Sequence, residues 1–310
     1  MKNKILVTGG TGFIGSSIVK YLLKDGQYVV AFDDNSRGSA KRLNIKEKKL
    51  FIIKGDIRDF KQVFKACKNI KTIIHCAAIN GTKNFYNKPD EVLEVGVKGI
   101  VNIIDCCKLK KIKNLYIASS SEVYSHPKKI PTKENIEIKI PDISNPRYSY
   151  SGSKILSELM GFVYGKKILK NMVIFRPHNV YGIDMGNDHV IPELINKVKK
   201  NKRIDVQGTG TQTRSFIFID DFIKAFDLIF RKGKTMNIYN IGTEERINIK
   251  ILLKKIISIC GNSSNKKIKY VPRPLGGTPH RCPDITKIKQ LGFKQSVDIE
   301  TGLKKIINHE

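Results

Sequence analysis

Apolar and polar positions in the first half of the chain alternate between two patterns. Short apolar runs of strand length are separated by segments with the helical period of about 3.6 residues. The expected strands are KILVTG, YVVAFD, LFIIKGD, TIIHCAA, NLYIASS and MVIFRP, and the expected helices span 12–23, 60–67, 89–108 and 151–164. Because strands that alternate with helices form βαβ units, the pattern predicts an α/β fold with a doubly wound parallel sheet.

The regular alternation weakens after residue 178, where Gly, Asn, Asp and Pro gather in YGIDMGNDHVIPEL. The later segment SFIFIDDFIKAFDLIF is expected to re-enter the sheet with a strand and a helix. We therefore expect one domain from residues 1–178, with 215–245 returning to it. A smaller C-terminal lobe would comprise 179–214 and 246–310.

Composition excludes several classes of protein. The net charge is +29, but the excess is mainly Lys scattered along the chain without a cluster of aromatic and basic residues, so we expect no nucleic-acid partner. No apolar run approaches the roughly 18 residues of a spanning helix, and no cleavage-site pattern follows the first residues. We expect a cytoplasmic protein without a membrane partner.

Cysteine and histidine positions predict no metal site. The six cysteines lack CxxC pairs and histidines at ligand spacing, so reduced core thiols are expected. His75 and His178 are interpreted as structural histidines. The pair Asp220–Asp221 precedes an amphipathic segment and is interpreted as a helix N-cap rather than a pair of catalytic acids.

A glycine pattern points to a dinucleotide. Gly9, Gly12 and Gly15 follow a strand and open a helix, which is the context in which a pyrophosphate approaches the backbone at a helix N-terminus. Asp33 ends the next strand, where a carboxylate takes the ribose hydroxyls and repels a 2′-phosphate. NAD is therefore the expected cofactor, and Arg37 leaves NADP as the alternative.

Tyr150 and Lys154 are candidates for catalysis. They are four residues apart, so on a helix they share one face. A nearby ammonium and a positive nicotinamide ring both favour the phenolate, which would then take a proton from a substrate hydroxyl while hydride leaves the same carbon.

The motifs TGGTGFIG, GDIRD, HCAA, SSSEVY, YSYSGSK, RPHNVYG and QTRSFIFIDD occur in this order. Together with Asp33, they make the chain resemble the extended short-chain dehydrogenases/reductases of the NAD-dependent epimerase/dehydratase kind, which act on nucleotide sugars. The resemblance implies a Rossmann domain followed by a nucleotide-sugar-binding lobe. The further cofactor contacts that it implies are Phe13, Ile14, Asp56, Ile57, Ala77, Ala78 and Pro177.

The resemblance also assigns roles in the serine-rich turn. Ser120 would hydrogen-bond the reacting sugar oxygen, normally at C4 of the hexose. Oxidation at C4 acidifies the hydrogens on C3 and C5, and Glu122 occupies the position where relatives keep a second acid or base. Three positions depart from the family pattern: Ser121 replaces an aspartate of the dTDP-glucose dehydratases, Ser125 a common glycine and Gly96 a common asparagine.

The substrate residues follow from the resemblance too. They are Asn179, His189, Val190, Arg214 and Arg281, and the last matches an arginine that decarboxylases use against the substrate carboxylate. The resemblance further implies a homodimer formed through the helix of Tyr150. The expected function is an NAD-dependent nucleotide-sugar epimerase/dehydratase. A UDP-glucuronate decarboxylase-like enzyme, a simple C4 epimerase and a non-catalytic binding or assembly protein are the alternatives.

Overall fold

The computed structural model describes residues 3–200, 203–261, 267–272 and 276–309. The chain divides into two compact units. Unit 1 comprises Met1–Val123, Ile138–Arg176 and Ile229–Tyr239, and unit 2 comprises Tyr124–Glu137, Pro177–Leu228 and Asn240–Glu310. Of the lobe expected at 246–310, residues 262–266, 273–275 and 310 lie outside the described residues. The assignment of cofactor and substrate roles to two domains stays a prediction.

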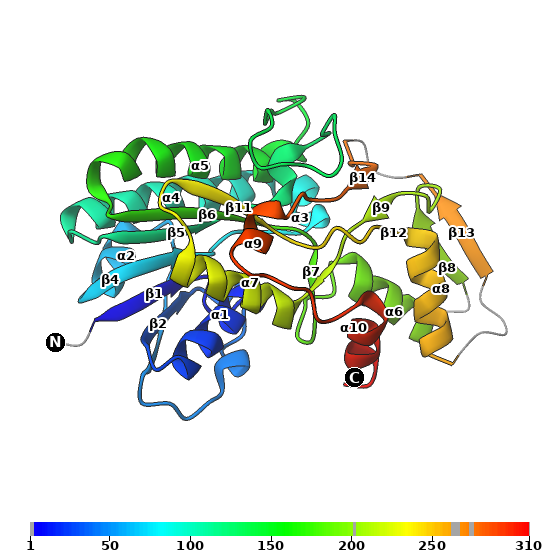
Figure 1. Ribbon diagram of the computed structural model, residues 1–310, viewed down its shortest axis with the longest axis horizontal. Helices are drawn as coiled ribbons and strands as arrows, with labels where there is room; N and C mark the ends of the chain where they lie inside the picture. The colour runs from blue at the N-terminus through cyan, green and yellow to red at the C-terminus, as the bar shows by residue number, and fades with distance from the viewer. Residues whose placement is uncertain (1–2, 201–202, 262–266, 273–275, 310) are drawn as a thin grey trace. The chain divides into compact units, whose positions relative to one another are not determined.

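Unit 1 is built on a sheet that, among the described residues, has seven strands in the order β11-β6-β5-β4-β1-β2-β3 (Figure 1). Their bounds are β1 Lys4–Thr8, β2 Tyr28–Asp33, β3 Leu50–Lys54, β4 Ile70–His75, β5 Asn114–Ala118, β6 Asn171–Pro177 and β11 Asn237–Ile241. Neighbours from β3 to β6 run parallel. The strand order reverses between β1 and β4, and α/β sheets bind ligands beyond the carboxyl ends of strands at such a point.

Helices cover both faces of this sheet, as the alternating pattern predicts. Their bounds are α1 Phe13–Lys24, α2 Phe60–Ala66, α3 Thr82–Asn87, α4 Pro89–Leu109 and α5 Tyr148–Ile168. Buried side chains of α2 and α4, such as Val63 and Ile103, pack against Ile73 and Ile174 of the sheet in one apolar cluster, to which α5 adds partly buried residues. Helix α1 lies on the opposite face (Figure 1). The predicted α/β fold with a doubly wound Rossmann sheet is confirmed.

Unit 2 combines helices with short strand pairs. The helices are α6 Val190–Lys200, α7 Ile219–Lys232, α8 Ile249–Ile259, α9 Thr286–Gln290 and α10 Ile299–Ile307, α7 ending in unit 1. The strands are β7 Val180–Tyr181, β8 Arg203–Gln207, β9 Thr213–Arg214, β10 Ile217–Phe218, β12 Ile247–Asn248, β13 Lys267–Val271 and β14 His280–Arg281. They form the groups β10-β7, β12-β9-β14 and β13-β8.

The expectation that SFIF re-enters the large sheet is wrong. Its strand β10 pairs with β7, and Phe218 packs edge-on against Tyr181 with ring centroids 5.4 Å apart. The strand that joins β6 at the edge of the sheet is β11. A two-residue apolar run does not by itself distinguish between these partners, because the choice depends on contacts with residues distant in the sequence.

The N-cap interpretation of Asp221 is also wrong. Helix α7 begins at Ile219, so Asp220 and Asp221 lie inside its first turn. The fully buried carboxylate of Asp221 accepts hydrogen bonds from the backbone N–H groups of Ser296 and Val297, both at 2.8 Å. Asp221 therefore anchors a distant segment of unit 2 instead of capping the N-terminus of its own helix.

The cysteines agree with the expectation of reduced thiols. All six cysteines are free thiols, and Cys67, Cys106, Cys107 and Cys282 are buried. Within the part of the chain that the structure describes, no helix has both the length and the apolar character needed to cross a membrane.

We predict that Gly15→Ala destabilises unit 1. A Cβ at this position would lie 2.0 Å from the carbonyl oxygen of Gly9, so the turn or the start of α1 must move. Overpacking of this kind costs about 1–3 kcal/mol of the free energy of unfolding, which denaturant titration measures. The matched control is Gly186→Ala, where a Cβ meets no atom within 4 Å. Equal stability of the two variants would contradict the prediction.

Candidate active site

The glycine-rich turn sits at the point where the strand order reverses. Gly9 has a φ of +66°, and a Cβ there would lie 2.8 Å from the backbone nitrogen of Ala77, which follows β4. Gly12 is the N-cap of α1 and forms no side-chain capping bond. The turn thus lacks side-chain bulk in front of the first N–H groups of a twelve-residue helix, and this cradle fits a pyrophosphate group. Phe13, Ile14 and Gly15 form the first turn of that helix.

Asp33 holds the same turn from the neighbouring strand. Its carboxylate accepts hydrogen bonds from the backbone N–H groups of Thr11 at 3.0 Å and Asn35 at 2.8 Å. Arg37, the residue that would accommodate a 2′-phosphate, directs its guanidinium elsewhere, since a Cβ on Gly81 would lie 3.6 Å from its Nη2. The charge of Arg37 is near enough to lower the pKa of Tyr150 against larger opposing effects.

Asp56 and Ile57, which the resemblance places beside the adenine, are engaged within the protein. Arg58 donates to the Asp56 carboxylate through Nε at 3.0 Å and Nη2 at 2.7 Å, and this hydrogen bonding holds the pKa of Asp56 below its usual value. Ile57 is buried, and its carbonyl accepts a bond from Asn102 at 2.8 Å. Asp56 therefore presents a neutralised carboxylate rather than a free one.

The turn after β5 brings three of the candidate catalytic residues together. Tyr150 and Lys154 lie on α5, and Lys154 Nζ is 5.7 Å from the centre of the Tyr150 ring. Ser120 lies near enough to Tyr150 for its hydroxyl to lower the pKa of the phenol. Ser120 Oγ also accepts a bond from the backbone N–H of Glu122 at 3.1 Å, and Lys154 Nζ donates to the carbonyl of Ala118 at 2.7 Å.

Burial controls the ionisation of this pair. Only 6% of Tyr150 and 3% of Lys154 is exposed. Burial raises the pKa of Tyr150 to about 12, although the Ser120 hydroxyl opposes the shift. Burial lowers the pKa of Lys154 to about 8, against the opposing electrostatic effects of Cys76 and Glu158. At neutral pH the phenol is therefore protonated, and the lysine is the stronger acid of the two.

Phe85 covers the tyrosine. Its ring stacks on Tyr150 with centroids 4.9 Å apart and planes 14° from parallel. Val92 completes the small apolar cluster. Ala78, which lies just beyond the end of β4, packs against this cluster. This cover excludes water from one side of the phenol and accounts for its raised pKa.

A buried ion pair supports the serine turn. Arg176 donates to Glu158 through Nε at 2.8 Å and Nη2 at 2.5 Å, and the side chains are only 2% and 4% exposed. Ser119 Oγ donates to the same carboxylate at 2.5 Å. The backbone N–H of Ser119 also bonds the carbonyl of Phe175 at 2.8 Å. The residue before Ser120 is thus held by both its backbone and its side chain.

Glu122 lies in a short 3-10 turn, Ser121–Tyr124, that follows Ser120. Its carboxylate accepts one hydrogen bond from Arg147 Nη2 at 3.4 Å, and the two side chains are 22% and 10% exposed. The negative charge of Glu122 acts on both Tyr148 and Tyr150. Glu122 is therefore beside the phenol and not a solvated turn residue.

The predicted substrate residues lie in unit 2. The predicted cofactor contact Pro177, at the end of β6, is the first residue of the unit 2 segment Pro177–Leu228. Arg214 and Arg281 are register partners on the parallel strands β9 and β14. Arg214 donates to the carbonyls of Thr213 and Pro279 at 2.8 and 3.1 Å, and to that of Thr278 at 2.8 Å. Arg281 Nη2 bonds Thr278 Oγ1 at 3.1 Å. The two guanidinium groups thus both donate hydrogen bonds to Thr278.

The remaining predicted substrate residues are Asn179, His189 and Val190. Asn179 has a φ of +41°, and its Nδ2 donates to the carbonyl of Ser215 at 2.9 Å. His189 precedes α6, which begins at Val190, and its carbonyl accepts a bond from Glu193 N at 2.9 Å. The structural interpretation of His178 agrees with its ring bond to Asn240 at 3.1 Å, and that of His75 with its bond to Thr8 at 2.8 Å.

Sequence reasoning missed Phe85, Arg147, Glu158 and Arg176. Two of them carry a signal: Glu158 lies four residues after Lys154 on the same helical face, and Arg176 is a charge inside an otherwise apolar strand run. Phe85 and Arg147 carry no comparable signal, because their partners are distant in the sequence.

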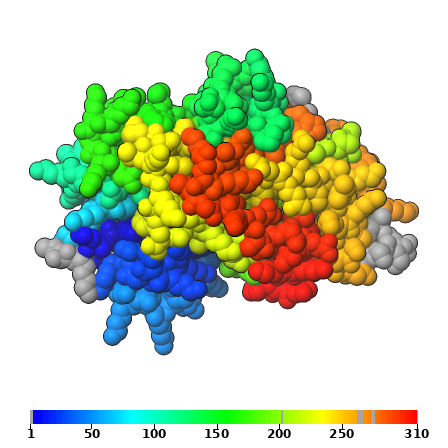
Figure 2. Space-filling view, in the orientation of Figure 1, coloured from blue at the N-terminus to red at the C-terminus, as the bar shows by residue number. Residues whose placement is uncertain are grey.

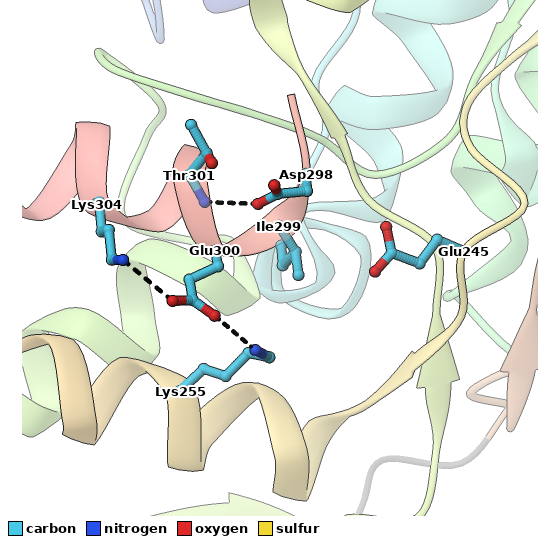
Figure 3. Close-up of a pocket in the computed structure, with 7 residues that line it drawn as sticks. All are labelled: Glu245, Lys255, Asp298, Ile299, Glu300, Thr301 and Lys304. Carbon is cyan, nitrogen blue, oxygen red and sulfur yellow. Dashed lines mark hydrogen bonds and ion pairs between the residues drawn. The ribbon is translucent and has the colours of Figure 1, made fainter. Parts of the chain in front are cut away.

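A surface pocket between α8 and α10 in unit 2 is not a candidate for catalysis (Figure 3). Figure 2 shows the C-terminal residues, in red, next to the yellow-orange residues near 250 at the surface. Its charged groups are largely paired with one another. Glu300 accepts bonds from Lys255 at 2.9 Å and Lys304 at 3.1 Å, and Asp298 caps α10 through Thr301 N at 2.7 Å (Figure 3).

The chain is similar to proteins with three different reactions. The family model described as the NAD dependent epimerase/dehydratase family matches residues 5–242. The dTDP-D-glucose 4,6-dehydratase of Dictyostelium discoideum is 34% identical over 83% of this chain, which spans only 62% of that relative. The UDP-N-acetyl-alpha-D-glucosaminuronate decarboxylase of Bacillus cytotoxicus is 32% identical over 99% of this chain and 97% of its own.

A solved structure extends the likeness to the fold. The UDP-glucose 4-epimerase of Thermotoga maritima with UDP-glucose has a TM-score of 0.88 and 25% identity, and the match covers 99% of this chain and 98% of that one. The strand order, the glycine-rich turn and these similarities agree, and the chain belongs to the NAD-dependent epimerase/dehydratase family of nucleotide-sugar enzymes.

Proposed function

We propose that this protein binds NAD and transiently oxidises C4 of a nucleotide-linked hexose, with Ser120, Tyr150 and Lys154 as the catalytic residues. The observation that carries the proposal is the buried Tyr150, whose ring centre lies 5.7 Å from the Lys154 ammonium and whose pKa Ser120 lowers. The glycine-rich turn and Asp33 would hold the dinucleotide, and NAD is favoured over NADP because the Asp33 carboxylate repels a 2′-phosphate while the guanidinium of Arg37 lies near Gly81.

Tyr150 takes the proton of the C4 hydroxyl in this mechanism, and Ser120 orients the oxygen. NAD, when bound, would supply the acceptor for the hydride that leaves C4. Lowering the pKa of Tyr150 from about 12 to about 7 requires an interaction of about 7 kcal/mol. Lys154 contributes to it only while protonated, which requires a pH below about 8.

Glu122 is the proposed second acid or base. A ketone at C4 acidifies the hydrogens on C3 and C5, so a carboxylate beside the phenol is placed to move a proton there. Relatives of this chain are named as a dehydratase, a decarboxylase and a 4-epimerase. Proton transfer by Glu122 separates the first two reactions from C4 epimerisation alone.

The nucleotide diphosphate would bind in unit 2. Arg214 and Arg281 are neighbours in register on β9 and β14, and planar guanidinium groups suit phosphate. Asn179 would add an amide donor, and His189 and Val190 would contact the nucleotide from the start of α6. The T. maritima neighbour is described with UDP-glucose, which supports this class of substrate.

We also propose a homodimer through α4 and α5. Leu93 and Val101 on α4 are 45% and 37% exposed, and Leu159 and Val163 on α5 are 57% and 48% exposed. Such an apolar patch is typical of a protein interface. The cytoplasmic location stays a prediction.

Tyr150→Phe should lower turnover of the substrate by about 10²–10⁴-fold, because general acid–base catalysis contributes that much. The assay measures conversion of UDP-, GDP-, CDP- and dTDP-sugars by product mass. Tyr164→Phe is the control on the same helix. Undiminished activity of Tyr150→Phe would contradict the proposed enzymatic function. The alternative of a non-catalytic binding or assembly protein would then remain.

Glu122→Gln should abolish the uptake of solvent deuterium at the sugar carbons. Hydride transfer from C4 of the sugar to NAD should persist in this variant. Product mass in D2O reads the first step and absorbance of the reduced nicotinamide the second. In the unmodified protein, loss of water identifies a dehydratase, loss of CO2 a decarboxylase, and gained deuterium at constant composition a 3,5-type epimerase. Epimerisation without deuterium in the unmodified protein would remove Glu122 from the mechanism.

The rate should fall as pH rises through about 8, since the Lys154 ammonium is lost there. Lys154→Arg keeps its charge to a much higher pH. Its residual activity, although lower, should show no decline near pH 8 when kcat is followed from acid to alkaline buffer. A decline that persists in Lys154→Arg would assign the titration to another group.

A further inference from the structure

Arg147 is a buried cation that the proposed mechanism does not use. It is the N-cap of α5, three residues before Tyr150, so the two side chains are neighbours on the helix surface. Only 10% of its side chain is exposed. Among the described residues its guanidinium forms one hydrogen bond, from Nη2 to Glu122 Oε2 at 3.4 Å.

Two other arginines of unit 1 each bind a carboxylate through two nitrogen atoms. Arg176 binds Glu158 through Nε and Nη2 at 2.8 and 2.5 Å. Arg58 binds Asp56 through the same two atoms at 3.0 and 2.7 Å. Arg147 makes a single contact near the outer limit of hydrogen-bond distance, so most of its planar fork of donors is left for another acceptor.

A guanidinium that is nine-tenths buried beside reactive groups needs an acceptor for its donors. The guanidinium of Arg147 is now bound by the carboxylate of Glu122. Arg147 is therefore placed to bind the carboxylate of a ligand instead. The backbone N–H of Glu122 donates to Ser120 Oγ at 3.1 Å, and Arg147 lies three residues before Tyr150 at the start of α5, so the pair stands next to the proposed site of C4 oxidation.

The geometry of the sugar selects the anion. When the C4 oxygen contacts Tyr150, the diphosphate on C1 is across the ring and cannot reach Arg147 at the same time. A substituent on C5 is adjacent to C4, and positions one helical turn apart are separated by about 5–6 Å between Cβ atoms. The C5 substituent that carries a negative charge is the carboxylate of a hexuronate.

We propose that the substrate is a nucleotide-linked hexuronate and that Arg147 binds its C5 carboxylate. The inference rests on the proposed function, because it takes C4 to be the carbon presented to Tyr150. The substrate carboxylate replaces Glu122 on the guanidinium, and Glu122 is released beside C5, where its proton transfer is proposed.

The test compares matched pairs of substrates: UDP-glucose with UDP-glucuronate, and the corresponding hexose and hexuronate pairs on dTDP and GDP. With NAD bound, kcat/KM is measured from product mass and from absorbance of the reduced nicotinamide. The unmodified enzyme should prefer the hexuronate on the order of 100-fold, since a site built for a charged group rejects the analogue that lacks it. Arg147→Met should reduce this ratio to less than about tenfold, and Arg147→Lys should restore part of it.

Arg231→Met, which removes an exposed partner of Asp25 in the same unit, is the control and should keep the full preference. A preference for the neutral hexose in the unmodified enzyme, or an equal loss on both substrates in Arg147→Met, overturns the inference and leaves C4 oxidation standing. Loss of the preference in Arg281→Met instead of Arg147→Met overturns it too. Failure of every nucleotide sugar to react would overturn the proposed function itself.

Discussion

The Glu158 carboxylate is the interaction on which the geometry of the catalytic turn depends. It accepts bonds from Arg176 and from Ser119, and its charge favours the protonated form of Lys154. One buried anion therefore ties α5 to the ends of β5 and β6. A buried ion pair adds little net stability compared with apolar residues, but losing one partner costs about 3–5 kcal/mol. Its value here lies in setting the position of Ser120 next to Ser119.

Desolvation sets the ionisation of the two catalytic groups. The same burial that raises the pKa of Tyr150 lowers that of Lys154, so at neutral pH the phenol is protonated, while the lysine keeps its charge only below about pH 8. Phe85 and Val92 maintain the dry surroundings of the phenol. In the proposed mechanism the phenolate then forms only when positive charge arrives beside it, which couples proton removal to the presence of the oxidised cofactor.

Two of the departures from the family pattern have a structural explanation. Gly96 lies where α4 crosses α5, and a Cβ there would be 2.4 Å from Ser153 Oγ. Ser125 has a φ of +47°, in the left-handed region that favours glycine, and its carbonyl accepts a bond from Thr278 Oγ1 at 2.6 Å. The close helix contact thus requires glycine at position 96, whereas Ser125 adopts the backbone conformation that the common glycine of relatives allows.

Local pattern was sufficient for much of this protein. The alternation of apolar runs and amphipathic segments predicted the α/β sheet, the glycine spacing predicted the turn after β1, and the four-residue spacing placed Tyr150 and Lys154 on one face of α5. These features depend on residues close together in the sequence. Only the tertiary structure decided that β10 pairs with β7, that Asp221 binds residues 296–297 and that Glu122 meets Arg147. Each of these pairings joins residues 25 or more positions apart, and long-range packing selects such partners among many with similar local preference.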